Sequence, residues 1–210
     1  MGIPVLIMGE SGSGKTASLR NFSPENIGIF NVASKPLPFI KKFPYTVNKA
    51  TYGLITASLQ KNALKTYVID DSQYLLSFEF LQKAKEVGFQ KFTDMALHFC
   101  NLLEVIRNNT SDDTLVYLLH HVEKDDFGHV KAKTIGKMID EKITLEGLFS
   151  IVLLAETDGK KYWFTTQSNG YTTAKSPMEM FDMTIDNDLK MVDDTIREYY
   201  ELGGKENGEN

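Results

Sequence analysis

Short apolar runs alternate with helical patterns along most of the chain. Runs of strand length cover residues 3–8, 27–32, 66–70 and 115–119, and helical patterns cover 16–21, 73–87, 92–108 and 188–202. Strands that alternate with helices predict right-handed crossovers and a mostly parallel sheet. The apolar runs at 148–155 and 162–167 are joined by Asp158-Gly159, which predicts a hairpin. We therefore expect an α/β fold with a mostly parallel central sheet, helices on both faces and a C-terminal β-hairpin.

Residues 1–202 are expected to form one domain, because a chain of 210 residues suits a single α/β core. The segment 203–210 reads GGKENGEN and is expected to be a disordered polar tail. No apolar run approaches the roughly 18 residues of a membrane-spanning helix, and the first residues lack a signal-peptide pattern. We expect a soluble, cytoplasmic protein with no membrane partner.

The net charge of −5 argues against a protein that coats nucleic acid through bulk electrostatics, because such domains carry a basic excess. Any contact with nucleic acid must then be local. Only three of the 23 basic residues are arginines, so lysines must supply most contacts with phosphate.

A glycine-rich motif follows the first apolar run: residues 9–16 read GESGSGKT. This is the GxxxxGK[ST] pattern of a P-loop, in the strand-to-helix context that a P-loop requires. Lys15 would neutralise the β- and γ-phosphate oxygens of ATP, and Thr16 would bind Mg²⁺. A glycine-rich loop that arose by chance is the alternative. The predicted cofactors are ATP and Mg²⁺, and the predicted binding residues are Gly9, Glu10, Ser11, Gly12, Ser13, Gly14, Lys15, Thr16 and Ala17.

Two carboxylates end the apolar run at 66–70, which reads TYVID and continues with Asp71. A buried strand that ends in carboxylates is typical of the second motif of P-loop ATPases. We expect Asp70 to hold Mg²⁺ through a water, together with Thr16. Asp71 is a candidate base for the attacking water, and a helix N-terminal cap is its alternative role. Glu10 is a weaker rival for the base.

The run at 115–119 ends in His120 and His121. These residues would lie beside the γ-phosphate if their strand sits between the strands of the P-loop and of Asp70. Either histidine would then sense the phosphate, and we take His120 as the candidate catalytic residue. A structural role is the alternative, because strand-end histidines are more often structural.

Gln167 ends the second strand of the predicted hairpin and precedes the turn Ser168-Asn-Gly170. A glutamine in this place suits coupling of the γ-phosphate to another ligand. Lys175, in the loop that follows, is the candidate for a finger that reaches the ATP of an adjacent subunit, since arginines are so few. A solvated loop is the alternative.

Residues 122–137 break the pattern of strands and helices, because they are polar and rich in lysine. They predict an excursion from the sheet whose lysines, with aromatic residues for stacking, suit single-stranded nucleic acid. A solvated face that also carries acidic residues is the alternative. The predicted nucleic-acid residues are Lys124, Lys131, Lys133, Lys137 and Tyr171, with Phe127 as a further stacking side chain.

These segments together resemble a known family. They are GESGSGKT, VIDD, a strand ending in LLHH, and then KTIGKMIDEKI, EGLFSIVL, TTQSNGYTTAKSPMEMF and IDNDL. The chain resembles the phage-encoded RecA-core ATPases, the small AAA-type nucleotide-binding proteins that include the Sak group of RecA-like single-strand annealing proteins. The likeness spans nearly the whole chain, and residues 133–189 are its specific part, because the P-loop and VIDD occur in many NTPases.

The resemblance implies a RecA-like ATPase that binds ATP and single-stranded DNA and assists phage recombination in the host cytoplasm. It also implies a homo-oligomer, either a filament or a ring, and a single-strand-binding protein as a partner. One departure stands out: RecA proteins place a catalytic Glu after the second core strand, where this chain reads Asn31-Val-Ala-Ser-Lys35. Hydrolysis then relies on Asp71, or ATP acts mainly as a conformational switch. A P-loop kinase for a small molecule is a further alternative, although residues 122–137 lack the arginines of a kinase lid.

Overall fold

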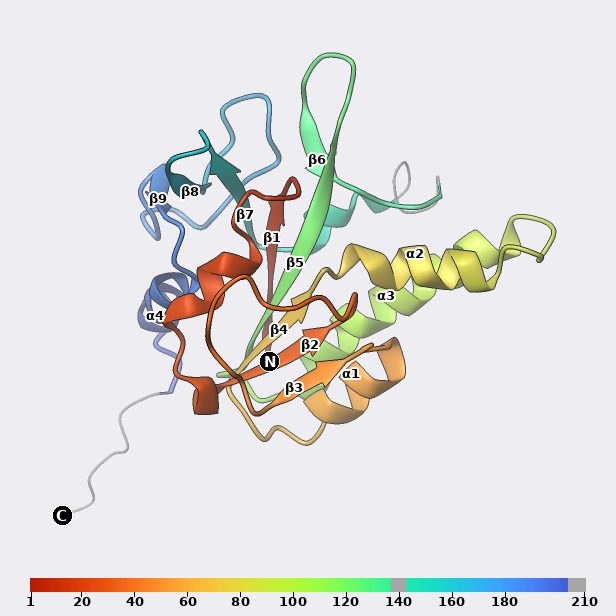
Figure 1. Ribbon diagram of the computed structural model, residues 1–210, viewed down its shortest axis with the longest axis horizontal. Coiled ribbons are helices and arrows are strands. Elements are labelled where there is room, and N and C mark those ends of the chain that lie inside the picture. Colours follow the sequence, from red (N-terminus) through yellow and green to blue (C-terminus); the bar gives the residue numbers. More distant parts are fainter. Residues whose placement is uncertain (137–142, 204–210) are drawn as a thin grey trace.

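A mixed sheet with the strand order β3-β2-β4-β5-β1-β7-β8-β9 runs through the centre of the protein, and β6 pairs with the far end of β5 (Figure 1). The structure is a computed structural model that describes residues 1–136 and 143–203. The described strands are β1 (Ile3–Gly9), β2 (Ile27–Asn31), β3 (Thr46–Asn48), β4 (Thr66–Asp70), β5 (Leu115–Lys124), β6 (Val130–Ala132), β7 (Ile151–Thr157), β8 (Tyr162–Thr165) and β9 (Thr184–Asp186). The described helices are α1 (Tyr52–Leu59), α2 (Gln73–Gln82), α3 (Gln90–Asn109) and α4 (Leu189–Tyr199), with the short 3-10 helices η1 (Thr16–Asn21), η2 (Pro24–Asn26) and η4 (Leu145–Leu148).

Six strands, from β3 to β7 in the sheet order, are mutually parallel, and β8 and β9 follow in antiparallel pairs. The prediction of an α/β fold with a mostly parallel sheet is confirmed. The predicted hairpin is also present, as β7 and β8, with Gly159 at a positive φ in its turn. The sheet does not end there, because β9 adds one more strand beside β8.

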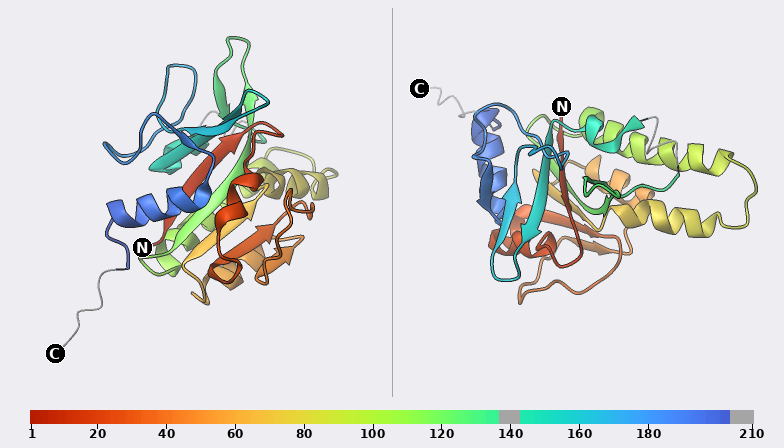
Figure 2. Two further views of the ribbon diagram at one scale, coloured as in Figure 1. Left: turned by 60° about the vertical axis from the view of Figure 1, so that its left-hand side comes forward. Right: turned by 90° about the horizontal axis from the view of Figure 1, so that it is seen from above.

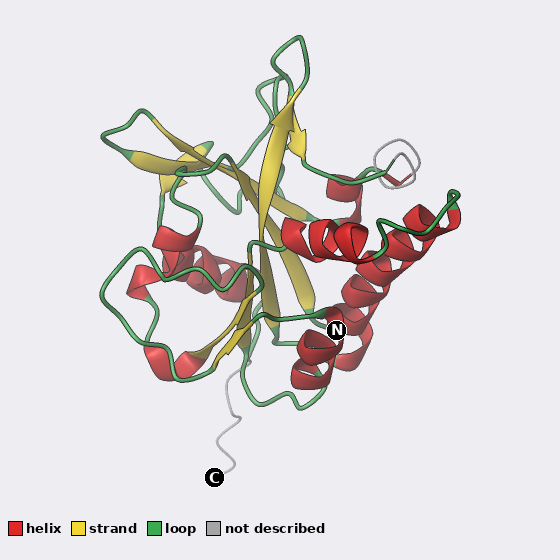
Figure 3. Ribbon diagram, turned by 45° about the vertical axis from the view of Figure 1, so that its right-hand side comes forward, coloured by secondary structure: helices red, strands yellow, loops and turns green. Residues whose placement is uncertain are grey.

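Helices cover both faces of the sheet, as predicted (Figures 2 and 3). Alternate residues of β1 show why. Leu6 and Met8 pack in a core with α1, α2 and α3, whereas Val5 and Ile7 pack with η1 and α4. Side chains of a strand point alternately to opposite faces, so a continuously apolar strand buries both of its faces.

Among the described α-helices and strands, α1, β3, β6 and β9 were not predicted. The sequence of α1 is apolar through most of its length and lacks a clear polar stripe, so helical periodicity does not reveal it. Thr51 caps the N-terminus of this helix, because its hydroxyl accepts a hydrogen bond from the backbone N–H of Leu54. The strand β3 has only three residues, fewer than a periodic pattern needs.

Several predicted bounds were wrong. β5 continues past Leu119 to Lys124, because β6 pairs with its far end. The predicted helix 73–87 ends at Gln82, and Gly88, at φ +97°, lies in the turn before α3. The segment 16–21 forms a 3-10 helix rather than an α-helix. Most of the expected tail, residues 204–210, lies outside the described residues.

None of the helices in the described part of the chain is long and apolar enough to cross a membrane.

Candidate functional site

The carboxyl ends of β1 and β4 meet at one edge of the sheet, level with His121 of β5, and bring Gly9, Asp70 and His121 together. β5 lies between β1 and β4, which is the order on which the placement of the histidines depends. His121 is level with Gly9 in the register of β1 and β5. Ligands of open α/β sheets bind at the carboxyl ends of the strands. A cavity of about 450 Å³ opens here, lined by Ser11, Gly12, Gly14, Lys15, Thr16, Ala17, Lys35, Pro36, Pro38, Asp70, Asp71, His121 and Tyr162.

The glycine-rich loop, residues 9–16, needs glycine at two positions for different reasons. A Cβ at Gly9 would lie 2.3 Å from Ser13 Oγ and 2.9 Å from the carbonyl oxygen of Ala155. Gly14 has φ +90°, and a Cβ there would lie 2.8 Å from the ring of Tyr162. Any side chain at these positions would displace the loop.

Lys15 is buried, and its ammonium group is held by its own loop. Nζ donates to the carbonyl oxygens of Gly9, at 2.7 Å, and of Glu10, at 2.8 Å. Burial lowers the pKa of Lys15 to about 8, although the charges of Asp71 and Asp70 offset part of this effect. The loop therefore holds a desolvated cation at the centre of the site.

Thr16 and Asp70 are joined by a hydrogen bond from Oγ1 to Oδ1, at 2.8 Å, across 54 residues of sequence. Burial raises the pKa of Asp70 to about 6, against the opposing effect of the bond from Thr16. A hydroxyl and a carboxylate are hard oxygen ligands of the kind that Mg²⁺ takes. The hydroxyl of Thr16 and the carboxylate of Asp70 are therefore suitable ligands for a divalent cation.

Asp71 lies between the side chains of Lys35 and His121. Its Oδ2 accepts from Lys35 Nζ at 2.8 Å, and its Oδ1 is 3.1 Å from His121 Nε2. Burial alone would raise the pKa of Asp71, but the bonds from His121 and Lys35 outweigh it and lower this pKa to about 2. Asp71 also has a left-handed backbone, at φ +60°. It is a weak base with both oxygens engaged.

The two histidines face opposite sides of the sheet, as neighbours in a strand must. His120 is fully buried. Its Nε2 donates to the carbonyl oxygen of Lys133 at 2.8 Å, and its Nδ1 lies 2.9 Å from Ser72 Oγ. Burial lowers the pKa of His120 to about 4, so the ring is neutral.

This arrangement corrects the choice of His120. With both ring nitrogens bonded inside the protein, His120 has none to offer a phosphate and acts as a structural link between β5 and its neighbours. His121 lines the cavity instead, with its ring edge-on to Tyr74. Of the two histidines, His121 is the one that faces the cavity.

Gln167 does not reach this edge, and the reason is strand direction. β8 is antiparallel to β7, so it runs away from the glycine-rich loop as it approaches Gln167. The amide Nε2 of Gln167 donates to Ser176 Oγ at 2.8 Å and to its carbonyl oxygen at 3.1 Å. The expectation that Gln167 contacts the γ-phosphate does not fit this geometry.

Lys175 lies beside the beginning of β7. Its backbone N–H and carbonyl exchange hydrogen bonds of 2.8 Å with Val152, which is level with Leu6 in β1. The side chain does not line the cavity of its own chain.

Three aromatic rings gather at the tip of the hairpin formed by β5 and β6. The ring of Tyr171 stacks on that of His129, at 5.7 Å between centroids, and Phe127 lies 6.3 Å from His129. Phe127 is 80% exposed and Tyr171 59% exposed. Tyr171 comes from a distant loop, held by a bond of 2.7 Å from Val130 N to its carbonyl oxygen. We call Phe127, His129 and Tyr171 the aromatic platform.

Lysines flank the aromatic platform. Lys124 pairs with Glu10 of the glycine-rich loop at 2.5 Å, and Lys131 pairs with Glu123 at 3.1 Å. Lys133 is exposed and follows β6. Lys137, the fourth predicted lysine, lies outside the described residues. The hairpin therefore carries exposed rings and lysines, and its Lys124 touches the loop that carries Lys15.

Three residues of the site were missed in the sequence. Lys35 follows β2 and could have been found by the same edge rule that finds Asp70, since β2 is parallel to β4. Tyr162 and Asn187 pack around Gly14, although each is more than 140 residues away in the chain. No local signal marks them. Asn187 is buried, and its Nδ2 has no hydrogen-bond partner among the described residues.

Comparisons of the chain with models of protein families and with curated proteins found no match.

Proposed function

We propose that this protein is a P-loop NTPase that binds Mg-ATP at the glycine-rich loop. The observation that carries the proposal is the hydrogen bond of 2.8 Å between Thr16 and Asp70, beside a buried Lys15. In the proposed complex Lys15 binds the β- and γ-phosphates, and its bonds to Gly9 and Glu10 hold it within the loop. Thr16 and Asp70 hold Mg²⁺, which would neutralise phosphate charge when bound.

The proposed reaction is slow hydrolysis of ATP. Asp71 is the nearest candidate to orient the attacking water, but its pKa of about 2 makes it a poor proton acceptor. Faster turnover requires that Asp71 be released from Lys35 or His121. We propose that His121 turns to the γ-phosphate, which would free one oxygen of Asp71.

The proposed stimulus is single-stranded DNA. Exposed rings that stack on bases, flanked by lysines that contact phosphates, are the usual means of binding single strands without sequence preference. The aromatic platform offers such rings, and Lys124 links it to the glycine-rich loop through Glu10. The resemblance to phage RecA-core ATPases supports a role in recombination or strand annealing, in a homo-oligomer that works with a single-strand-binding protein.

The test is release of phosphate from ATP by the purified protein, with and without single-stranded DNA. Lys15→Ala is the blank, and Lys61→Ala is a matched control because Lys61 is exposed in the turn after α1. Turnover that DNA raises, and that Lys15→Ala abolishes, supports the proposal. Turnover that is equal in Lys15→Ala and in the unmodified protein would refute it.

A second candidate is a nucleotide switch that does not hydrolyse ATP. The observation in its favour is the double engagement of Asp71 by Lys35 and His121, together with the lack of a carboxylate in 31–35. Tight binding of ATP with no release of phosphate, even with DNA present, would select this candidate.

A further inference from the structure

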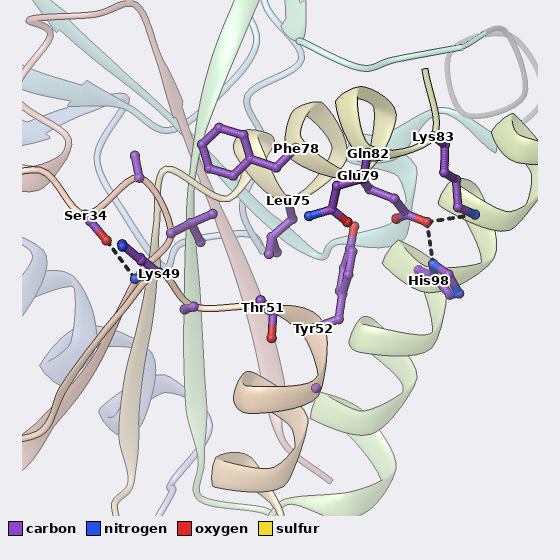
Figure 4. A pocket seen from close by; sticks show the side chains of 14 residues that line it. Ser34, Lys49, Thr51, Tyr52, Leu75, Phe78, Glu79, Gln82, Lys83 and His98 are labelled. Atoms are coloured by element: carbon purple, nitrogen blue, oxygen red, sulfur yellow. Dashed lines mark hydrogen bonds and ion pairs between the residues drawn. The ribbon is translucent and has the colours of Figure 1, made fainter. Parts of the chain in front are cut away.

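A cavity of about 740 Å³, larger than the one at the glycine-rich loop, lies between the end of β2 and helices α1, α2 and α3 (Figure 4). Its walls include Ala33 and Ser34, which come just before Lys35 in the chain. They also include Leu75 and Phe78 of α2, the helix that begins just after Asp71. The cavity has the size of a small-molecule site, for which roughly 300–1,000 Å³ is usual.

Two of the side chains that line this cavity each carry a buried polar atom with no hydrogen-bond partner among the described residues. These atoms are Oε2 of Glu79 and the hydroxyl of Tyr52. Glu79 is only 9% exposed, and its other oxygen, Oε1, is 2.7 Å from His98 Nδ1 and 3.2 Å from Lys83 Nζ. Burial raises the pKa of the Tyr52 hydroxyl, so this group remains a neutral donor. A buried polar atom without a partner costs about 1–3 kcal/mol, which makes two at one cavity a functional signal.

The charges around Glu79 narrow the chemistry of a ligand. Lys83 and His98 already occupy Oε1 of the carboxylate, so a further cation beside Glu79 would meet the charge of Lys83. An anion at Oε2 would meet the carboxylate itself. A neutral group is therefore favoured at Oε2. One atom of the protein, Oε2 of Glu79, accepts a hydrogen bond, and the other, the Tyr52 hydroxyl, donates one.

We propose that this cavity binds a small neutral heteroaromatic molecule through an edge that carries an N–H donor beside a hydrogen-bond acceptor. A nucleobase presents such an edge: an amino group donates to Glu79 Oε2, and a ring nitrogen accepts from Tyr52. The apolar walls formed by Phe78, Leu75 and Ala50 enclose the ring. This site is separate from the proposed nucleotide site and does not depend on it.

Adenine is the first probe, and methyl-labelled protein followed by NMR shows where it binds. We expect shifts of the methyl groups of Ala33, Ala50 and Leu75 and none at Ala17, which lines the cavity of the glycine-rich loop. Purine has the same ring without the amino donor, so it should bind about tenfold more weakly, as one lost hydrogen bond predicts.

Two variants test the two protein atoms. Glu79→Gln and Tyr52→Phe should each weaken adenine binding about tenfold. Tyr52→Phe keeps the ring and serves as the safer variant if Glu79→Gln disturbs folding, because Glu79 also bonds to His98 and Lys83. Tyr45→Phe, at an exposed tyrosine outside the cavity, should change nothing.

Three outcomes would overturn the proposal. Adenine could fail to shift Ala33, Ala50 and Leu75. It could bind equally well to Tyr52→Phe and to the unmodified protein, which would mean that a bridging water satisfies the two atoms. The same methyl groups could also shift with protein concentration alone, which would identify a second polypeptide as the occupant. None of these results depends on ATP binding, so the two proposals fail separately.

Discussion

The glycine-rich loop and the aromatic platform differ in how their polar groups are held. At the loop, Lys15 and Asp70 are buried and bonded within the chain. At the platform, Phe127 and Tyr171 are exposed, and the ring of each lies against His129. The first arrangement fixes a few atoms for a ligand of defined shape. The second offers surface to a ligand that varies.

This difference separates two kinds of effect. Substitution at the loop should remove charged hydrogen bonds that nothing else replaces, and its effects should be large. Substitution of one ring at the platform should leave the neighbouring rings to stack on the bases, so the loss of affinity for single-stranded DNA should be smaller.

The largest effect is expected for Lys15→Ala. Loss of a charged donor to phosphate should weaken ATP binding about a hundredfold, whereas binding of single-stranded DNA without nucleotide should not change. Calorimetry with ATP and fluorescence anisotropy with DNA measure the two, with Lys61→Ala as the control. If Lys15→Ala binds ATP as tightly as the unmodified protein does, Lys15 does not contact the phosphates, and the proposed difference between the loop and the platform is wrong.

The next effect is expected for Tyr171→Ala. Loss of one stacking ring should weaken binding of single-stranded DNA about tenfold, since each stacked base contributes about 1–3 kcal/mol. Tyr171→Phe should retain most of the affinity. Tyr45→Ala, at a tyrosine that is 51% exposed elsewhere, is the control. If Tyr45→Ala and Tyr171→Ala lower the affinity equally, the platform is not the binding surface.

A change of comparable size is expected in the affinity for Mg-ATP when the pH falls and Asp70 gains a proton. Its pKa of about 6 means that the carboxyl gains a proton as the pH falls through this value. Mg²⁺ needs the ionised form, so binding of Mg-ATP should weaken up to about tenfold for each pH unit below about 6. Asp70→Asn retains the titration of ATP and of the other residues of the site, and it is the reference. Parallel pH profiles for the two proteins would contradict the assignment of Asp70.

The smallest effect is expected for Glu10→Gln, which frees Lys124. The pair is exposed on both sides, and such pairs contribute about 0–1 kcal/mol. Affinity for single-stranded DNA should rise by a factor of about two to five at low salt and should be unchanged at high salt. Lys124→Ala should lower it. A fall in affinity for Glu10→Gln would show that Glu10 serves the platform in another way.

Sequence reasoning succeeded where one rule of geometry connects distant residues. Parallel strands end at one edge, so Asp70 could be placed beside Thr16 from the pattern alone. The same rule misplaced Gln167, because β8 runs in the opposite direction and a strand end then lies at the other edge.

To choose between His120 and His121, one must know to which side of the sheet each side chain of β5 points. Alternation shows that only one of the two can face the loop, but it does not show which one until the packing of the strand is known. Leu118 packs in the core on the side of the sheet that α3 covers. His120, two residues further along β5, points to the same side, and its ring lies near that of Phe99. Lys35 follows β2, where the edge rule could have placed it. Tyr162 begins β8 and Asn187 follows β9, and no pattern in the chain shows that these two lie beside Gly14.

The left-handed backbone of Asp71 limits which residues this position can accept. Aspartate, asparagine and glycine adopt such a conformation with little penalty, whereas other side chains pay about 1–2 kcal/mol. Glutamate, whose longer side chain would reach further toward a water, belongs to the penalised group. The position can therefore lose its carboxylate by a substitution that leaves the backbone undisturbed, but it can lengthen that carboxylate only with strain. In this fold, replacing Asp71 with a longer carboxylate costs more conformational free energy than replacing it with a residue that has no carboxylate.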